Sequence, residues 1–277
     1  MTEEEQKIRD EAIAYAKNHK HARCAELTDT STYPPEEAPV SVFMAGSPGA
    51  GKTESAKEII AELERRQPEA PKVLRIDPDD LRGEFPGYTG ANSWLFQYAA
   101  SIWVDKMHDL ALKQSQTFLL DSTLSNLQRA RLNVQRSLKR HRPVTIWYVY
   151  QSPLVAWEFV QAREEEEGRR ILPELFIEQY FAARDVVNAL KQEFGANMEV
   201  DLLLKPNDQT VKLVQQGIDR IDTRSGAVYP RAARSRARGE ARLICSFHSS
   251  EPESRWLNPR RSRSSSEASQ PPRNRCT

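Results

Sequence analysis

Short apolar runs alternate with amphipathic segments along residues 1–222. In residues 53–66, for example, Ala56, Ile59 and Leu63 recur at helical spacing. Five runs have the length and the β-branched or aromatic content of buried strands, and they span residues 40–45, 72–76, 117–120, 144–150 and 198–204. Strands that are separated by helices of crossover length pair in parallel. The pattern therefore predicts an α/β fold, with a mostly parallel sheet covered by helices on both faces.

Before the first strand the chain departs from this alternation. A polar helix is predicted over Glu3–Ala22, and the stretch around Pro34 and Pro35 predicts a linker. We therefore divide the chain into an N-terminal helix with its linker (1–39), one main domain (40–222) and a tail (223–277). The acidic N-terminus and the lack of a long apolar stretch predict a cytoplasmic protein with no membrane span.

The tail at 223–277 has a composition of its own. It holds 12 Arg, no Lys and four acidic residues, a net charge of +8, against −7 for the residues before it. Because it lacks periodicity and has too few apolar residues to offset the entropy of ordering, we expect it to be disordered. It would be either an arm for nucleic acid or an acidic partner, or a non-selected extension. We favour the extension, since no aromatic platform is interleaved with the basic runs, and we do not expect nucleic-acid binding.

A complete phosphate-binding motif, G-x-x-x-x-G-K-[ST], follows the first predicted strand and opens the first crossover helix. Its glycines let the backbone turn tightly, so that successive N–H groups point at phosphate oxygens from the positive end of a helix. The lysine of such a loop reaches the β- and γ-phosphates, and the threonine hydroxyl ligates Mg²⁺. The motif predicts a bound nucleoside triphosphate with Mg²⁺ on Thr53, and its residues are Gly46, Ser47, Pro48, Gly49, Ala50, Gly51, Lys52 and Thr53.

The second predicted strand ends in three carboxylates, Asp77, Asp79 and Asp80, followed by Arg82. We expect this strand to lie beside the strand that carries the phosphate loop, which brings the carboxylates within reach of a γ-phosphate and an incoming hydroxyl. Phosphoryl transfer needs such an acid to orient the hydroxyl and to accept its proton. Asp77 and Asp80 have an equally good role as caps of a short helix, so Asp79 is the candidate base.

The third predicted strand is followed by Asp121, Ser122 and Thr123. An acid at the end of such a strand holds Mg²⁺ directly or through water. It would serve as well to bind the hydroxyls of a sugar, or simply to stabilise the next turn. The pattern alone leaves these three roles open.

A charged segment with arginines on both sides of Gly168 follows the fourth strand. Arg163 and Arg170 could close over a triphosphate and neutralise charge on the transferred group. Most charge runs, however, are solvated faces, and this segment alone favours that interpretation.

Together these motifs resemble those of the zeta toxin family of P-loop kinases, over about Val40–Leu204. Family members look like Gly-x-Pro-Gly-x-Gly-Lys-Thr, and then Ile-Asp-x-Asp with a basic residue and a proline, here Arg82 and Pro86. The family's catalytic base falls on Asp79. Its two lid arginines fall on Arg163 and Arg170, and this agreement reverses the interpretation of that segment as a solvated face.

One family motif is altered in this chain. The family has Glu-Gly-Thr with an arginine soon after, and these positions contact its sugar substrate. Here the residues are Asp121-Ser122-Thr123, with Ser125 where the arginine is expected. The resemblance implies that Arg82, Asp121 and Thr123 contact the acceptor, and the altered motif lies among these acceptor contacts.

The resemblance implies an ATP-dependent kinase for the 3′-hydroxyl of UDP-N-acetylglucosamine or a related UDP-sugar. It also implies a toxin that is held in check by a small helical antitoxin. In the implied mechanism Lys52, Arg163 and Arg170 act on the phosphates and Asp79 takes the proton from the hydroxyl. A similar kinase of plant-pathogenic bacteria phosphorylates NAD, and chloramphenicol phosphotransferase is similar in fold, so another metabolite or an antibiotic is an alternative acceptor.

A nucleotide-dependent switch that phosphorylates no metabolite is the competing class. The chain has no guanine-specific Asn-Lys-x-Asp motif, and the carboxylates after the second strand suit a hydroxyl acceptor better than a hydrolytic water. Four aromatic residues could suggest a stacking surface, but they lie on a helix predicted over 91–114, where we expect core packing. They are Trp94, Phe96, Tyr98 and Trp103.

Overall fold

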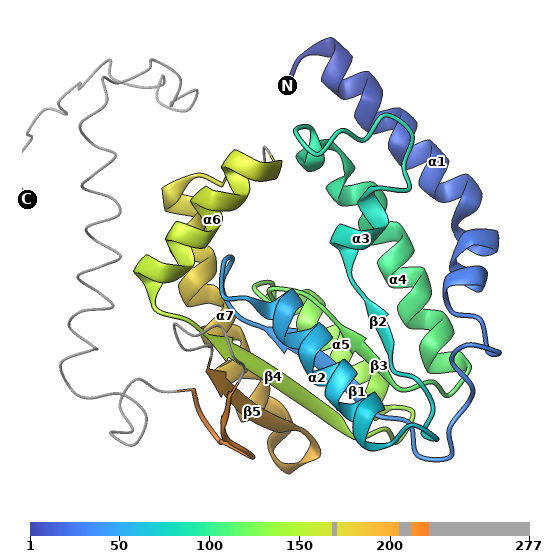
Figure 1. Cartoon of the computed structure of the whole chain (residues 1–277), viewed down its shortest axis with the longest axis vertical. Helices are drawn as coiled ribbons and strands as arrows, with labels where there is room; N and C mark the ends of the chain where they lie inside the picture. The colour runs from blue at the N-terminus through green and yellow to red at the C-terminus, as the bar shows by residue number, and fades with distance from the viewer. Residues whose placement is uncertain (168–170, 205–211, 222–277) are drawn as a thin grey trace, which may run out of the picture.

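A six-stranded sheet forms the centre of the molecule, in the order β2-β3-β1-β4-β5-β6 (Figure 1). The computed structural model describes residues 1–167, 171–204 and 212–221. Both Arg170 and the predicted tail at 223–277 lie outside these residues. The strands are β1 (Ser41–Ala45), β2 (Leu74–Ile76), β3 (Phe118–Leu120), β4 (Val144–Tyr150), β5 (Glu199–Leu204) and β6 (Lys212–Gln215).

Five strands pair in parallel, which confirms the predicted fold class. Helices cover both faces, as predicted. The α-helices are α1 (Glu3–Leu27), α2 (Lys52–Arg66), α3 (Pro78–Arg82), α4 (Gln97–Lys113), α5 (Leu127–Leu138), α6 (Pro153–Glu167) and α7 (Pro173–Phe194). Two short 3₁₀ turns, η1 (Ser93–Phe96) and η2 (Gly195–Asn197), complete the described elements.

Alternate residues of the strands enter different cores. Phe43 of β1 packs in one cluster with residues of α1, α4, α5 and α7, whereas Met44 packs in a second cluster with Ala56 of α2. A strand buried on both faces reads as a continuous apolar run, which is why these strands were visible in the sequence. A third cluster joins α6 to α7 through Trp157, Phe176 and Tyr180.

The expected position of the second strand is wrong. β3, and not β2, lies beside β1, and β2 pairs only with β3 among the described strands. The fully buried Phe118–Leu120 run suits the inner place, while β2 carries the charged Arg75 and takes the edge. The expectation failed because the hydrophobic pattern identifies strands but does not order them in space.

At the other edge, β6 pairs antiparallel with β5. This strand was not predicted. Lys212-Leu213-Val214-Gln215 has only two apolar residues, which is too short a run to distinguish a strand from a loop by periodicity.

The N-terminal helix α1 packs against α4, side by side along much of its length (Figure 1). It does so through small residues, since Ala12, Ala16 and Cys24 are buried in the main core. The indole of Trp103 on α4 donates a hydrogen bond to the Ala16 carbonyl, at 2.9 Å. The linker after α1 is also held, because the Gln116 side chain donates to the Tyr33 carbonyl at 2.7 Å. The proposed division at residue 39 remains a prediction, but α1 docks on the main domain.

The four aromatic residues of the η1–α4 segment divide into two pairs. Phe96 and Trp103 are buried, as predicted. Trp94 and Tyr98 are 56% and 53% exposed, so the prediction of core packing is wrong for them. Tyr98 lies off the side of α4 that Ala99, Ala100 and Trp103 bury, and Trp94 is the residue of η1 that is not buried. Aromatic content alone does not show which side of a helix faces the core.

The main core contains a buried histidine, His108 of α4, between the rings of Phe43 and Phe118. Burial, together with the nearby positive charges of Arg136 and Arg142, lowers the pKa of His108 to about 3. The folded protein therefore keeps this imidazole neutral at pH values where the unfolded chain protonates it. Below about pH 6.5 the unfolded state binds more protons at this residue, so folding stability falls as the pH falls.

We expect the His108→Leu variant to lose less stability on acidification than the wild type. Between pH 7.5 and 5 the difference should reach about 2 kcal/mol, because each unit of pKa shift corresponds to about 1.4 kcal/mol. Urea unfolding of both proteins at the two pH values measures it. Asp77, whose pKa is raised, titrates with the opposite sign but is common to both proteins. Equal losses in the two proteins would show that His108 is not the responsible group.

Candidate functional site

The phosphate loop runs from the end of β1 to the start of α2, as predicted. Gly46, Gly49 and Gly51 all have positive φ angles of 144°, 70° and 78°, and Gly51 is the N-terminal cap residue of α2. The Lys52 ammonium folds back over the loop and donates to the Ser47 carbonyl at 2.8 Å. The loop thus presents the N-terminus of a 15-residue helix and a cation at one place, which is an anion-binding arrangement.

The loop packs closely against the end of β4 and against α6. A Cβ on Gly49 would lie 2.0 Å from the Ala156 carbonyl oxygen, and a Cβ on Gly46 would lie 2.5 Å from the Val149 carbonyl oxygen. Both contacts are with backbone, which cannot swing aside. Glycine is therefore required here for the approach of two backbones as well as for the φ angle.

We expect Gly49→Ala to destabilise the protein by at least about 2 kcal/mol and to abolish ATP binding, because the loop must leave its place to relieve the clash. Urea unfolding and calorimetric titration with ATP measure the two effects. Gly83→Ala is the matched control, since Gly83 has a φ of −62° and nothing within 4 Å of its Cβ position. An intact ATP affinity in the Gly49→Ala protein would contradict the packing argument.

Lys52 lies among the other candidate residues. Burial lowers the pKa of its ammonium, the carboxylate of Asp121 raises this pKa, and Arg163 lowers it. The Asp79 carboxylate acts on the Lys52 pKa in the same direction as Asp121. Residues of α3 and α6, and the residue that follows β3, therefore all lie within electrostatic reach of the loop lysine.

Asp121 follows β3 directly and is buried. Burial raises the pKa of this carboxyl, and the Lys52 ammonium and a hydrogen bond from the Thr53 hydroxyl lower it. Its Oδ2 atom is buried and has no hydrogen-bond partner within the described part of the chain. Asp121 thus faces the Lys52-Thr53 end of the phosphate loop, and the Arg75 guanidinium of β2 lies 3.7 Å from its Oδ2, beyond hydrogen-bond distance. Thr123 lies next to the start of the same loop, since its carbonyl accepts from the Gly46 N–H at 3.4 Å.

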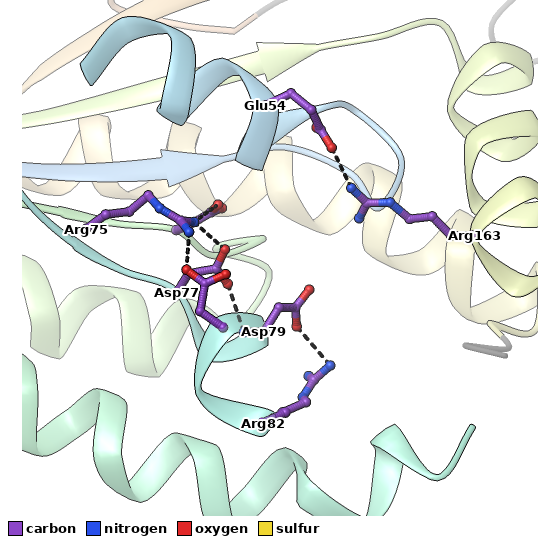
Figure 2. A network of polar contacts seen from close by, with 8 residues as sticks. Glu54, Arg75, Asp77, Asp79, Arg82 and Arg163 are labelled. Carbon is purple, nitrogen blue, oxygen red and sulfur yellow. Dashed lines mark hydrogen bonds and ion pairs between the residues drawn. The ribbon is translucent and has the colours of Figure 1, made fainter. Parts of the chain in front are cut away.

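The helix α3 carries the candidate base. Asp77 caps α3, and its Oδ1 accepts from the Asp79 N–H at 2.8 Å, which confirms the capping role that the sequence left open. The Asp79 carboxylate forms an ion pair of 2.8 Å with Arg82 (Figure 2). Arg82 in turn donates to the Gln97 side chain at 2.9 Å. Asp79 remains 34% exposed, so it is held in place but accessible to a ligand.

Arg75, in the middle of β2, was missed by the sequence reasoning. Its guanidinium pairs with Asp77 at 2.5 Å, with Asp80, and with Asp121 at 3.7 Å. The signal in the sequence was a charged residue inside the apolar run Leu74-Arg75-Ile76. A cation in a buried strand needs a partner, and here the partners are the two carboxylates on either side of Asp79 and that of Asp121.

Arg163 of α6 reaches across to the phosphate loop helix. Its guanidinium pairs with Glu54, in the first turn of α2, at 2.7 Å (Figure 2). Both side chains are partly exposed, so this ion pair is weak and easily exchanged for an anionic ligand. Arg163 therefore lies beside the first turn of α2, and its role as a lid arginine stays a prediction. Arg170 falls outside the described residues.

The fold and the site define a P-loop kinase. A glycine-rich anion loop, a lysine, and carboxylates at the ends of two strands meet at the carboxyl edge of a parallel sheet. The family model described as Zeta toxin matches residues 24–218. The chain belongs to the zeta toxin family and is an ATP-dependent kinase.

Solved structures share this fold. The PezAT chromosomal toxin-antitoxin system of Streptococcus pneumoniae matches with a TM-score of 0.61 at 14% identity, over 87% of this chain and 98% of that chain. The AvrRxo1-ORF1:AvrRxo1-ORF2 complex with sulphate ions matches with a TM-score of 0.52 at 16% identity, over 78% of this chain and 68% of that chain. The same complex with ATP gives 0.51 at 15% identity, over 84% of this chain and 70% of that chain. At these identities the likeness establishes the fold alone.

A search of curated protein sequences finds no match to the chain. Within residues 1–167, 171–204 and 212–221, none of the helices combines the length and the apolar character that a membrane span requires. The cytoplasmic location therefore stays a prediction.

Proposed function

We propose that this protein transfers the γ-phosphoryl group of ATP to the 3′-hydroxyl on the sugar of UDP-N-acetylglucosamine or a related UDP-sugar. The observation that carries the proposal is the placement of Asp79. This carboxylate is ion-paired with Arg82, partly exposed, and within electrostatic reach of Lys52. A hydroxyl bound between Asp79 and the phosphate loop would meet both a proton acceptor and the γ-phosphate.

The residues at the end of the loop fit Mg²⁺. Thr53 supplies a hydroxyl, and the adjacent Asp121 has a buried oxygen with no hydrogen-bond partner in the described part of the chain. Carboxylate and hydroxyl oxygens are the ligands that Mg²⁺ takes beside a nucleotide phosphate. Thr53 and Asp121 would hold the ion, which would neutralise negative charge on the triphosphate. These contacts support the metal-side role of Asp121, and its role in holding the acceptor stays a prediction.

In the proposed reaction the sugar hydroxyl oxygen attacks the γ-phosphorus, and the bond to the ADP oxygen breaks. The hydroxyl proton passes to the Asp79 carboxylate. Lys52 neutralises the β- and γ-phosphates. The Arg163 guanidinium leaves Glu54 and binds the phosphoryl group that is transferred. Arg170 is proposed as the second lid arginine on the sequence motif alone. None of these residues forms a covalent bond to the substrate, so catalysis consists of positioning and charge stabilisation.

The acceptor side is proposed to include Arg82 and Thr123. Arg82 is buried, and its Nε atom has no hydrogen-bond partner among residues with described positions, so it has an unused donor beside Asp79. An anionic or hydroxyl-rich acceptor would satisfy this donor. NAD or another metabolite offers similar groups and is the alternative acceptor.

We also propose that the protein is a toxin whose partner is a small helical antitoxin. The support is its family and its likeness to a structure from a chromosomal toxin-antitoxin system. Residues 40–222 are proposed as the kinase domain.

The test is ATP consumption by purified protein with a panel of UDP-sugars, NAD and no acceptor, followed by mass spectrometry of the products. A phosphorylated UDP-sugar supports the proposal. A different phosphorylated metabolite would replace the substrate and keep the mechanism. Acceptor-independent hydrolysis would favour a nucleotide-dependent switch and overturn the proposal.

A further inference from the structure

The guanidinium of Arg75 contacts carboxylates from two different elements at the carboxyl end of the sheet (Figure 2). Its Nη1 atom lies 2.5 Å from Asp77 Oδ2 and 3.7 Å from Asp121 Oδ2. Its Nη2 atom bonds to Asp80. Asp77 and Asp80 flank the candidate base, Asp79, and Asp121 belongs to the phosphate side of the site.

The helix that carries Asp79 depends on such contacts. α3 has five residues, little more than one turn, and a helix of this length has no stability of its own. Asp77 accepts the Asp79 N–H with one carboxylate oxygen and the Arg75 guanidinium with the other. A continuous chain of hydrogen bonds therefore runs from the middle of β2 to the backbone of Asp79.

We propose that Arg75 is a positioning residue for phosphoryl transfer. It holds α3 on both sides of Asp79 and ties this helix to Asp121 at the end of β3. The distance between the proton acceptor and the phosphate loop is thereby fixed by one side chain that is only 15% exposed. This inference rests on the proposed role of Asp79 as the base.

A purely structural role would be to neutralise the buried carboxylates of Asp77 and Asp121. That role needs no contact with Asp80, whose side chain is 56% exposed and solvated. The bond to Asp80 adds nothing to the neutralisation of buried charge, but it does restrain the far side of Asp79. The contacts of Arg75 are thus better explained by a role in holding α3 in place than by neutralisation of buried charge alone.

The experiment compares Arg75→Gln, Arg75→Lys and Asp80→Asn with the wild type. Arg65→Gln is the matched control, because Arg65 also makes a two-pronged bond to a carboxylate, that of Glu62, on the exposed surface of α2. Three readouts are taken: hydrogen exchange of the peptide spanning 77–83, ATP binding, and turnover with ATP and UDP-N-acetylglucosamine.

We expect Arg75→Gln to speed hydrogen exchange in α3 and to lower kcat by about 100-fold, the effect of a displacement of about 1 Å in a catalytic group. ATP binding should be retained. Arg75→Lys should recover only part of the loss, since an ammonium cannot bond two carboxylates in the planar geometry of a guanidinium. Asp80→Asn leaves Arg75 paired with Asp77, so it should cause the same changes in exchange and turnover to a smaller extent. If Arg75→Gln fails to fold, Asp80→Asn is the variant that tests the proposal.

The double variant of Arg75→Gln and Asp79→Ala distinguishes a positioning role of Arg75 from a purely structural role. If Arg75 acts through Asp79, Arg75→Gln should cause no further loss of turnover in the Asp79→Ala background. Multiplicative losses, or unchanged α3 exchange in both Arg75→Gln and Asp80→Asn, would overturn the inference. If the wild type phosphorylates no acceptor, the proposed substrate fails, while the exchange of α3 still decides whether Arg75 clamps this helix.

Discussion

Asp79→Ala is expected to lower phosphoryl transfer by at least about 100-fold, the usual contribution of a general base, without unfolding the protein. Asp79 is partly exposed but Arg82 is buried, so loss of their ion pair should lower the stability without unfolding the protein. Arg82 keeps its bond to Gln97 in the variant. Steady-state kinetics with ATP and UDP-N-acetylglucosamine, together with urea unfolding, measure the two effects.

Asp105→Ala is the control for this change. Asp105 of α4 is an exposed aspartate that also pairs with an arginine, Arg129, at 2.7 Å. Its replacement should leave turnover unchanged. Turnover retained by a folded Asp79→Ala protein would remove Asp79 from the role of base, and a retained kinase activity would then need another proton acceptor.

Lys52→Ala is expected to reduce kcat by about 100- to 1,000-fold, because the variant loses the cation that neutralises charge on the transferred group. The protein should remain folded, since burial already disfavours the charged form of this ammonium, as its lowered pKa shows. Kinetics and ATP titration on the purified variant measure the loss. Lys57→Ala, an exposed lysine on the same helix, is the control and should behave as wild type. Normal turnover in Lys52→Ala would mean that the loop does not hold the reacting triphosphate.

Local features of the site could be predicted from the sequence. The phosphate loop is contiguous, and its glycines, lysine and threonine occupy the places that the motif requires. The cap at Asp77 was also visible, because a cap and its helix are neighbours in the chain. Such features depend on residues a few positions apart, which a sequence displays directly.

Features that depend on contacts between distant segments could not be predicted. The placement of β3 between β1 and β2 brings Asp121 towards Arg75, 46 positions earlier in the chain by their residue numbers. The contact of Arg163 with Glu54 joins α6 to α2 in the same way. Periodicity shows which residues are buried, but it does not show which partner each buried charge meets.

The fate of the γ-phosphate tests the central claim most directly. Purified protein is incubated with ATP and UDP-N-acetylglucosamine, and the products are analysed by mass spectrometry and phosphorus NMR, with Asp79→Ala and Lys52→Ala in parallel. A UDP-sugar that carries one added phosphoryl group on its 3′-hydroxyl, formed by the wild type and not by the variants, is the predicted result. Release of the γ-phosphate only as inorganic phosphate, at the same rate with and without every acceptor of the panel, would contradict the assignment of this site to phosphoryl transfer onto a metabolite.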